Sequence, residues 1–417
     1  MMSVEGPYLT ALIARLSEPE FNLAAYGVAF SIALIVESPV IMLLSASIAL
    51  VENKKTFLKL RSFIYSLNLA LVLFMVILIY PPVYNKLAIG ILNLPARVAH
   101  LTHMAIVLLI PWAPSIGYRR FYQGIMIKNN LTRLVALGTV IRLIAMSATA
   151  FLLYRYTNTH GVIIGASALS AGVITEAFAT KIMSLRIVRN ICNSSEEGKD
   201  ISYKSILDFY FPLVLTSFIS LGVQPIVTFF MGQSTNALES LAVLPVLNSL
   251  VFIFRAFGLS YQEVGVALIK SKHDYILLKN FALIMAIGVV SVLGLVSFTP
   301  IGDLWLLNVA GLSNSLADFA RFPLMLYTIF PATTVWINFQ RSVLVCVRDT
   351  KHITYASGIE VAGILLVLLV TVNFLSMIGV VAAIIAYTFG RSFAVGYLIF
   401  PFTKAKNKIF MTDTGAV

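Results

Sequence analysis

Cysteine and charge are both scarce in this sequence. Its two cysteines, Cys192 and Cys346, stand alone and match neither a disulfide framework nor a metal-binding pattern. Only 12% of the 417 residues are charged, whereas a soluble protein needs roughly a quarter to cover its surface. This scarcity excludes an ordinary soluble protein, because the surplus apolar surface must face something other than water.

Motifs that carry catalysis or bind nucleotides are also missing. The sequence has no glycine-rich phosphate loop with a lysine, no HExxH, no GxSxG and no clustered nucleophile and base. We therefore expect neither an enzyme nor a bound cofactor or metal. Without an ATP-binding motif, any work that the protein does has to be driven by an ion gradient, of protons or of sodium.

Apolar residues, by contrast, are abundant. They make up 59% of the chain, and the mean hydropathy is +0.91. Stretches long enough to cross a hydrocarbon core of about 30 Å recur along the chain, and isolated strands would leave backbone groups unsatisfied in lipid. We predict an all-α, polytopic membrane protein with about 12 transmembrane helices. Counting a shorter apolar piece at 7–16 as the first span, the others are 23–50, 62–82, 101–126, 133–154, 162–186, 205–230, 240–269, 280–300, 320–346, 353–375 and 378–402.

Basic residues are distributed unevenly between the two sides of these helices. Of the 30 lysines and arginines, 22 follow even-numbered spans, and five lie on the opposite side. The 22 fall within 51–61, 119–133, 181–204, 270–279, 341–351 and 404–408. Because basic loops stay in the cytoplasm, both termini are expected there. The same distribution accounts for the net charge of +12 without a nucleic-acid partner.

The chain repeats itself at a shift of 218 residues. The matched residues include Leu23-Ala24 with Leu241-Ala242, Lys54 with Lys272, Pro82 with Pro300 and, after an adjustment of two residues, Pro111 with Pro331. An even number of spans in each half predicts two parallel six-helix repeats. We expect an N-terminal lobe at 1–186, a cytoplasmic linker at 187–204 and a C-terminal lobe at 205–417 with a short basic tail.

The repeat also bears on the first span. The seventh span begins near Ile206, and the 218-residue shift places its counterpart before Met1. We therefore expect the first helix to be truncated, with Met1 an internal or wrongly assigned start or the chain genuinely shortened. The alternative is a short re-entrant first helix.

Ionisable residues at membrane depth are the candidate functional residues. They cost about 2.5–3.5 kcal/mol each on insertion scales, so they normally line a water-filled cavity or pair with one another. Glu37 lies mid-span, two residues before Pro39, where the missing N–H frees a backbone carbonyl. We predict a proton or cation site there; the alternative is a structural pair with an arginine.

Other deep charges complete this set. Arg255 occupies the position equivalent to Glu37, so we expect both to face the interface between the halves, as a salt bridge that opens during transport or as a joint binding site. The remaining deep charges that we select are Arg142, Arg391 and Glu176. A purely structural pair is the alternative for each.

Two adjacent arginines, Arg119 and Arg120, lie among tyrosines at the end of the fourth span. A guanidinium group holds carboxylate or phosphate through two hydrogen bonds, which favours an anion-binding ledge. The alternative is snorkelling to lipid headgroups, with the tyrosines as an interfacial belt. We assign one arginine to each role.

These features resemble a known superfamily. The two six-span halves and the polar linker are similar to the multidrug/oligosaccharidyl-lipid/polysaccharide (MOP) flippases, which include the multidrug and toxic compound extrusion (MATE) proteins. The sequence runs that carry the resemblance are Leu23–Ser31, Glu37-Ser38-Pro39, Arg120–Thr132, Phe211–Thr216 and Gln224-Pro225. Within the superfamily, the chain most resembles the progressive ankylosis-protein branch and its bacterial relatives.

The resemblance implies a V-shaped pair of six-helix bundles with alternating access and proton or sodium antiport. For the ankylosis branch it implies export of organic anions. The bacterial relatives imply residence in a bacterial inner (plasma) membrane.

We therefore expect a secondary active efflux transporter for a small organic solute, anionic or drug-like. Arg142, Arg255 and one of Arg119 or Arg120 are expected to hold an anion, and Glu37 to exchange the coupling ion. The expected partners are a small-molecule substrate and membrane lipid, and the protein is expected to be a monomer. The alternatives are a flippase for a lipid-linked precursor, with a large cationic cavity, and a non-transporting membrane scaffold, with every deep charge paired.

Overall fold

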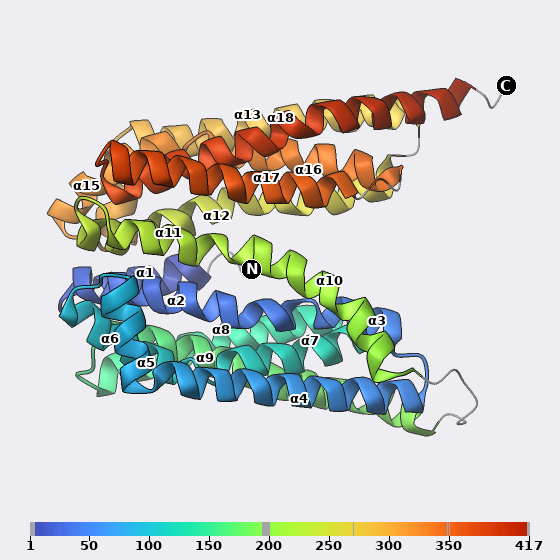
Figure 1. The fold of residues 1–417 in the computed structure, drawn as a ribbon, viewed down its shortest axis with the longest axis horizontal. Coiled ribbons are helices and arrows are strands. Elements are labelled where there is room, and N and C mark those ends of the chain that lie inside the picture. The colour runs from blue at the N-terminus through green and yellow to red at the C-terminus, as the bar shows by residue number, and fades with distance from the viewer. Residues whose placement is uncertain (1–4, 194–200, 270, 348, 350, 415–417) are drawn as a thin grey trace. The chain divides into compact units, whose positions relative to one another are not determined.

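The computed structural model of the protein describes residues 5–193, 201–269, 271–347, 349 and 351–414, and Figure 1 shows them as long helices. Among these residues the one extended pairing is an isolated bridge between Thr235 and Ile378. Ten helices or helix pairs in the described ranges are long and apolar enough to cross a membrane, and a shorter apolar segment covers Ser217–Gly232. The chain is therefore an all-α, polytopic integral membrane protein, as predicted.

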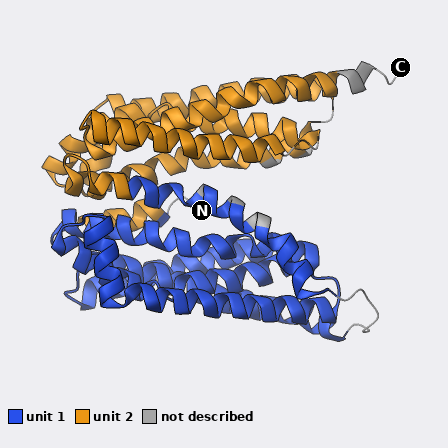
Figure 2. Ribbon diagram, in the orientation of Figure 1, with its two compact units in different colours: residues 1–5, 16–228 blue, residues 6–15, 229–417 orange. Residues whose placement is uncertain are grey.

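The helices form two compact units, which Figure 2 colours separately. Unit 1 contains Met1–Glu5 and Leu16–Thr228, and unit 2 contains Gly6–Arg15 and Phe229–Val417. Helix α1 (Glu5–Ala14) belongs to unit 2 except for its first residue, and α10 (Tyr203–Leu221) belongs to unit 1. These units follow contacts, whereas the predicted lobes follow the order of the chain. Residues 194–200 of the predicted linker lie outside the described residues.

In unit 1, α7 (Trp112–Lys128) packs against most of its neighbours. It contacts α2, α3, α4, α8 and α9, and its residues from Phe121 to Met126 are all buried. A helix enclosed on every side buries whatever charges it carries. The helices around it are α2 (Pro19–Ile41), α3 (Leu43–Leu50), α4 (Lys54–Ile79), α5 (Pro81–Asn85), the π-helical η2 (Lys86–Ile91), α6 (Ala96–Leu108), α8 (Thr132–Tyr156) and α9 (Gly161–Asn193).

In unit 2, α16 (Phe330–Cys346) has the corresponding position. It contacts α12, α13, α17 and α18. The other helices are α12 (Ala237–Leu268), α13 (Lys272–Phe298), α14 (Ile301–Asp303), η3 (Leu304–Val309), α15 (Asn314–Tyr327), α17 (Lys351–Leu368), η4 (Leu369–Phe374) and α18 (Gly379–Thr414), while α11 (Val223–Gly232) runs across the unit boundary.

The outer helices of both units present apolar side chains outwards. Only 22% of the apolar windows of α4, α8, α13 and the α17 span is buried within the protein, against 50–61% for the other spans. Exposed apolar surface of this extent faces lipid rather than water. The helices that carry the deep charges are therefore either shielded by neighbours, as α7 and α16 are, or turn one polar face inwards.

The 218-residue repeat is present in the helices themselves. Equivalent helices begin 218 residues apart at α2 and α12, α4 and α13, α6 and α15, α7 and α16, and α9 and α18. The π-helical segments η2 and η3 differ by the same number. Because α7 and α16 keep this shift, the two-residue adjustment that we predicted between Pro111 and Pro331 does not occur at these helix starts.

Two glycines show that the repeat also holds for contacts within each unit. A Cβ atom on Gly172 of α9 would lie 3.1 Å from the Arg142 carbonyl oxygen, and one on Gly390 of α18 would lie 2.8 Å from the Glu360 carbonyl oxygen. Small residues allow helices to approach this closely. Arg142 on α8 and Glu360 on α17 thus occupy equivalent positions.

Pro39 interrupts the first long span of unit 1. Helix α2 ends at Ile41 and α3 begins at Leu43. Because proline has no N–H, the Ile35 carbonyl one turn earlier loses its helical partner. The Ser38 hydroxyl donates a hydrogen bond to that carbonyl at 2.7 Å. This local repair keeps the break stable beside Glu37.

Candidate functional site

Unit 1 buries a group of charged side chains, which we name the unit 1 cluster. They come from α1, α2, α7, α8 and α9. Its members are Glu5, Glu37, Arg119, Arg120, Arg142 and Glu176. Three arginines and three glutamates give the cluster a formal balance of charge.

Glu176 on α9 is the centre of the unit 1 cluster. Its side chain has no exposed surface. Its Oε2 atom accepts a hydrogen bond from Arg119 and lies 3.9 Å from Nη1 of Arg142, and its Oε1 atom accepts one from Nε2 of Gln123 at 3.2 Å. A buried carboxylate is least costly when its charge and lone pairs are satisfied in this way.

Arg142 on α8 also donates a hydrogen bond to Glu5, from Nη2 to Oε2 at 2.5 Å. The other oxygen of Glu5, Oε1, is buried and has no hydrogen-bond partner among the described residues. Glu5 was not among the predicted site residues, because it precedes the first apolar piece at 7–16. Acids at the ends of spans are common, so its position carried no signal.

Glu37 on α2 differs from the other two carboxylates. Only 8% of it is exposed, yet within the described part of the chain it has no hydrogen-bond or ion-pair partner within contact distance. The positive charge that acts most strongly on it is that of Arg120, followed by Arg119. A buried carboxylate with electrostatic support and open lone pairs can take up a proton or a small cation.

Arg119 and Arg120 lie differently on α7. Arg119 is 2% exposed and pairs with Glu176, so it lies in the interior of unit 1 and does not snorkel. Arg120 is half-buried, and Glu37 is the carboxylate that acts most strongly on it. Neither side chain has a partner outside the unit 1 cluster among the described residues.

Unit 2 holds a second group, which we name the unit 2 cluster. Its members are Arg255 on α12, Arg341 on α16, Glu360 on α17 and Arg391 on α18. Arg391 donates from Nε to Oε1 of Glu360 at 2.7 Å and from Nη1 to Oγ1 of Thr334 at 3.2 Å. Nη2 of Arg341 lies 4.0 Å from Oε2 of Glu360 and donates to the Ser357 hydroxyl at 3.3 Å.

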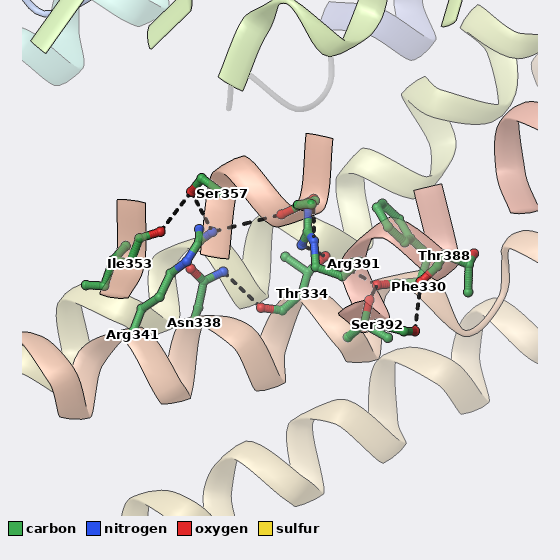
Figure 3. A network of polar contacts seen from close by, with 11 residues as sticks. Phe330, Thr334, Asn338, Arg341, Ile353, Ser357, Thr388, Arg391 and Ser392 are labelled. Atoms are coloured by element: carbon green, nitrogen blue, oxygen red, sulfur yellow. Dashed lines mark hydrogen bonds and ion pairs between the residues drawn. The ribbon is translucent and has the colours of Figure 1, made fainter. Parts of the chain in front are cut away.

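The polar side chains of α16 share one face. Figure 3 shows Thr334, Asn338 and Arg341 in a row, with Ser357 and Arg391 opposite them. Spacings of four and three residues bring helical side chains to the same side. Arg341 was not among the predicted site residues, because it lies among the basic residues at the end of a span.

The Phe330 ring contacts two guanidinium groups in the unit 2 cluster. The Cζ atom of Arg255 lies 4.8 Å from the ring centroid, and that of Arg391 lies 5.1 Å from it. Tyr327 and Tyr387 stack beside this ring, with centroids 6.2 Å apart. Aromatic faces attract cations, so Phe330 stabilises both arginines without neutralising them.

The structure brings five of the seven predicted site residues together in unit 1 and the other two in unit 2. The five are Glu37, Arg119, Arg120, Arg142 and Glu176, and the two are Arg255 and Arg391. A Glu37–Arg255 salt bridge and a joint site of Arg142 with Arg255 would join residues of different units, and both stay predictions. Among the described residues, no three side chains of the metal-ligating types gather into one group.

No protein-family model and no curated protein matches this sequence. Solved structures do resemble the fold. The chain superposes on an inward-facing multidrug resistance MATE family transporter of the MOP superfamily with a TM-score of 0.76 at 12% identity, covering 100% of this chain and 96% of the other. It superposes on the lipid II flippase MurJ, in an inward closed conformation, with a TM-score of 0.75 at 17% identity, covering 99% of this chain and 88% of the other.

A third match is a MOP superfamily transporter from Pyrococcus furiosus, with a TM-score of 0.53 at 14% identity and coverage of 97% and 98%. These likenesses show that the chain has the fold of the MOP superfamily, as the sequence resemblance implied. Its place in the ankylosis branch stays a prediction.

Proposed function

We propose that this protein is a secondary active transporter that exports a small organic solute by alternating access, in exchange for protons or sodium ions. The observation that carries the proposal is Glu37, a buried carboxylate without a direct partner, beside a proline break and close to the unit 1 arginines. A charge left in this state is costly in a membrane protein. Exchange of a coupling ion gives a physical reason for its presence.

Antiport does not require the ion and the solute to touch. It requires that each binds one of two states of the protein more tightly than the other. The unit 1 cluster is balanced when Glu37 is ionised, and a proton on Glu37 leaves it with one excess positive charge. Such a change in a region of low dielectric constant is large enough to favour one state over the other.

The test is transport by the purified protein in proteoliposomes. Radiolabelled solutes would be screened with and without an imposed proton or sodium gradient. For a solute that is transported, we expect Glu37→Gln to abolish the response to the gradient while solute exchange at equilibrium continues. Glu52→Gln is the matched control, because Glu52 is an exposed carboxylate at the end of the same span. Full gradient response in Glu37→Gln would contradict the assigned role.

A second candidate function is flipping of a lipid-linked precursor. The likeness to the lipid II flippase, with 99% of this chain covered, favours it. The discriminating measurement is the movement of a fluorescent lipid-linked pyrophosphate between leaflets of the same proteoliposomes. Movement of the lipid without transport of any soluble solute would replace the first proposal by this one.

We further propose that the protein resides in a bacterial inner membrane as a monomer, with both termini in the cytoplasm. The excess of basic residues after even-numbered spans supports this orientation. Replacing Lys55 and Thr159 singly by cysteine, with Cys192 and Cys346 removed, would test it in whole cells. An impermeant maleimide is expected to label the residue at 159 and not that at 55. Light scattering of the purified protein would give the oligomeric state.

A further inference from the structure

The unit 2 cluster has more positive charge than its neighbours neutralise. Arg255, Arg341 and Arg391 share a single carboxylate, Glu360, among the side chains that the structure describes. The other described acids of unit 2 lie at helix ends: Glu239, Asp274, Asp303, Asp318 and Asp349. Among the side chains that the structure describes, two positive charges at membrane depth therefore have no anionic partner.

The equivalent cluster of unit 1 shows what balance at these positions looks like. There Arg142, at the position of Glu360, and Glu37, at the position of Arg255, belong to a set of three arginines and three glutamates. Arg341 and Arg391 correspond to the uncharged Gln123 and Val173, so these two arginines and the exchange of sign at position 255 together leave unit 2 unbalanced. The excess charge is thus specific to unit 2 and is not a general property of the repeat.

Arg255 contributes one of these two charges. It forms no ion pair or hydrogen bond with any described residue, and its buried Nε atom has no partner. Its contacts are the Phe330 ring and, electrostatically, Arg391, the two tyrosines and Glu360. Close by, the Tyr387 hydroxyl is buried and also has no hydrogen-bond partner among the described residues. Two buried groups without a hydrogen-bond partner among the described residues therefore lie close together.

We propose that the unit 2 cluster is the binding site for an oxyanion, a carboxylate or phosphate group, held by Arg255 beside Arg391. This proposal rests on the proposed transport function and assigns the solute to the organic anions. A guanidinium group offers parallel N–H donors that match the two oxygens of such a group. Glu360, which both Arg341 and Arg391 approach, limits the excess charge to what a monoanion or dianion neutralises.

Binding of inorganic phosphate to the purified full chain in phosphatidylcholine nanodiscs, measured by titration calorimetry, tests the proposal without transport. We expect Arg255→Gln to weaken binding by about tenfold or more, because a charge-assisted hydrogen bond is lost. We expect Glu360→Gln to strengthen binding, because the competing carboxylate is removed. A purely structural ion pair predicts no gain of affinity in that variant.

Arg321→Gln is the matched control, because Arg321 is an exposed arginine of unit 2 paired with Asp303. It is expected to leave phosphate affinity unchanged. Arg255→Lys keeps the charge but lacks the parallel N–H donors of the guanidinium group, and it covers the case in which Arg255→Gln fails to fold. We expect this variant to bind phosphate more weakly than the wild type. Phosphate binding that is the same in the wild type, Arg255→Lys and Glu360→Gln would overturn the proposal.

A second set of nanodiscs containing phosphatidylglycerol identifies the source of the oxyanion. If this lipid competes with phosphate in the wild type, a headgroup reaches the same arginines; if it does not, the ligand is a soluble anion. The outcome is separable from the transport proposal. Phosphate binding without transport would support this site and contradict the proposed function. Gradient-driven transport, with phosphate binding unaltered in Arg255→Lys and Glu360→Gln, would support the proposed function and contradict this site.

Discussion

Arg142 on α8 and Glu360 on α17 stand at equivalent positions of the two repeats, and each faces an opposite charge on the following helix. Arg142 lies 3.9 Å from Glu176 of α9, and Glu360 lies 2.7 Å from Arg391 of α18. Both units thus pair this position with an opposite charge on the following helix, with the signs reversed, although the partners are not equivalent, because Glu176 corresponds to Ala394. A deep charge is less costly when it has a partner, and either order of the two charges supplies one.

Loss of the Glu176 charge is expected to destabilise unit 1 severely. Glu176→Gln would leave Arg119 and Arg142 facing each other with no carboxylate between them. Removing one member of a buried pair costs about 3–5 kcal/mol, because the remaining charge is uncompensated. Reversible unfolding in mixed micelles would measure the change in the free energy of unfolding.

The control for this variant is Glu18→Gln. Glu18 pairs with Arg97 at 2.6 Å, but both side chains are about two-fifths exposed. An exposed pair contributes about 0–1 kcal/mol. Equal losses in Glu18→Gln and Glu176→Gln would show that burial does not govern the strength of these pairs.

Ser38→Ala tests the repair of the proline break. The Ser38 hydroxyl is the donor to the Ile35 carbonyl, which Pro39 deprives of its helical partner. We expect a loss of about 1 kcal/mol in the free energy of unfolding, since a partly buried carbonyl is left without a donor. Ser392→Ala removes a similar hydroxyl, which donates to an intact helix at an exposed position, and is expected to cost less. Equal effects in both variants would remove the special role of Ser38.

The spans and the repeat were predictable because both depend on properties that a sequence displays directly. Apolar length identifies a span, and the 218-residue shift is visible in matched residues such as Lys54 and Lys272. The grouping of α1 with unit 2 and of α10 with unit 1 was not predictable. It depends on which apolar faces pack together, and in apolar helices nearly all faces look alike in sequence.

The same reasoning applies to the charged clusters. Glu37, Arg142 and Arg391 were found because a charge within an apolar stretch is conspicuous. Glu5 and Arg341 were missed because charges near span ends are ordinary. The partners could not be assigned, since pairing depends on helix rotation, which the hydropathy of such uniformly apolar helices leaves undetermined.

The double cation contact of Phe330 predicts an unusual cost for a conservative substitution. Phe330→Leu would remove the ring that faces both Arg255 and Arg391. Each contact is worth about 0.5–2 kcal/mol, more when desolvated. Phe339→Leu is the matched control, because Phe339 is equally buried on the same helix and its ring contacts other rings but no cation among the described residues. We expect Phe330→Leu to lower the free energy of unfolding by about 1–2 kcal/mol more than Phe339→Leu. Equal losses would show that the cation contacts contribute nothing.

Both units have a glycine–serine contact at equivalent positions, but the two residue types are exchanged: Gly124 corresponds to Ser342, and Ser47 corresponds to Gly265. Two substitutions can therefore give one unit the pattern of the other. In unit 1 a Cβ atom on Gly124 would lie 2.7 Å from Cβ of Ser47, and in unit 2 one on Gly265 would lie 2.7 Å from Cβ of Ser342, with each position shifted by 218. The Ser47 hydroxyl donates to the Phe121 carbonyl at 2.7 Å, and the Ser342 hydroxyl donates to the equivalent Phe339 carbonyl at 2.8 Å.

Gly124→Ser alone is therefore expected to force α3 and α7 apart, at a cost of about 1–3 kcal/mol for overpacking. The double variant with Ser47→Gly is expected to recover part of that loss. It removes the clash with Ser47 but leaves the Leu44 carbonyl oxygen 2.6 Å from the new Cβ atom, and the new serine is placed to donate to the same Phe121 carbonyl, as Ser342 does to Phe339. Ser47→Gly alone is also measured for comparison. If the losses in the free energy of unfolding were additive, so that the double variant was less stable than either single variant, the two contacts would not be equivalent.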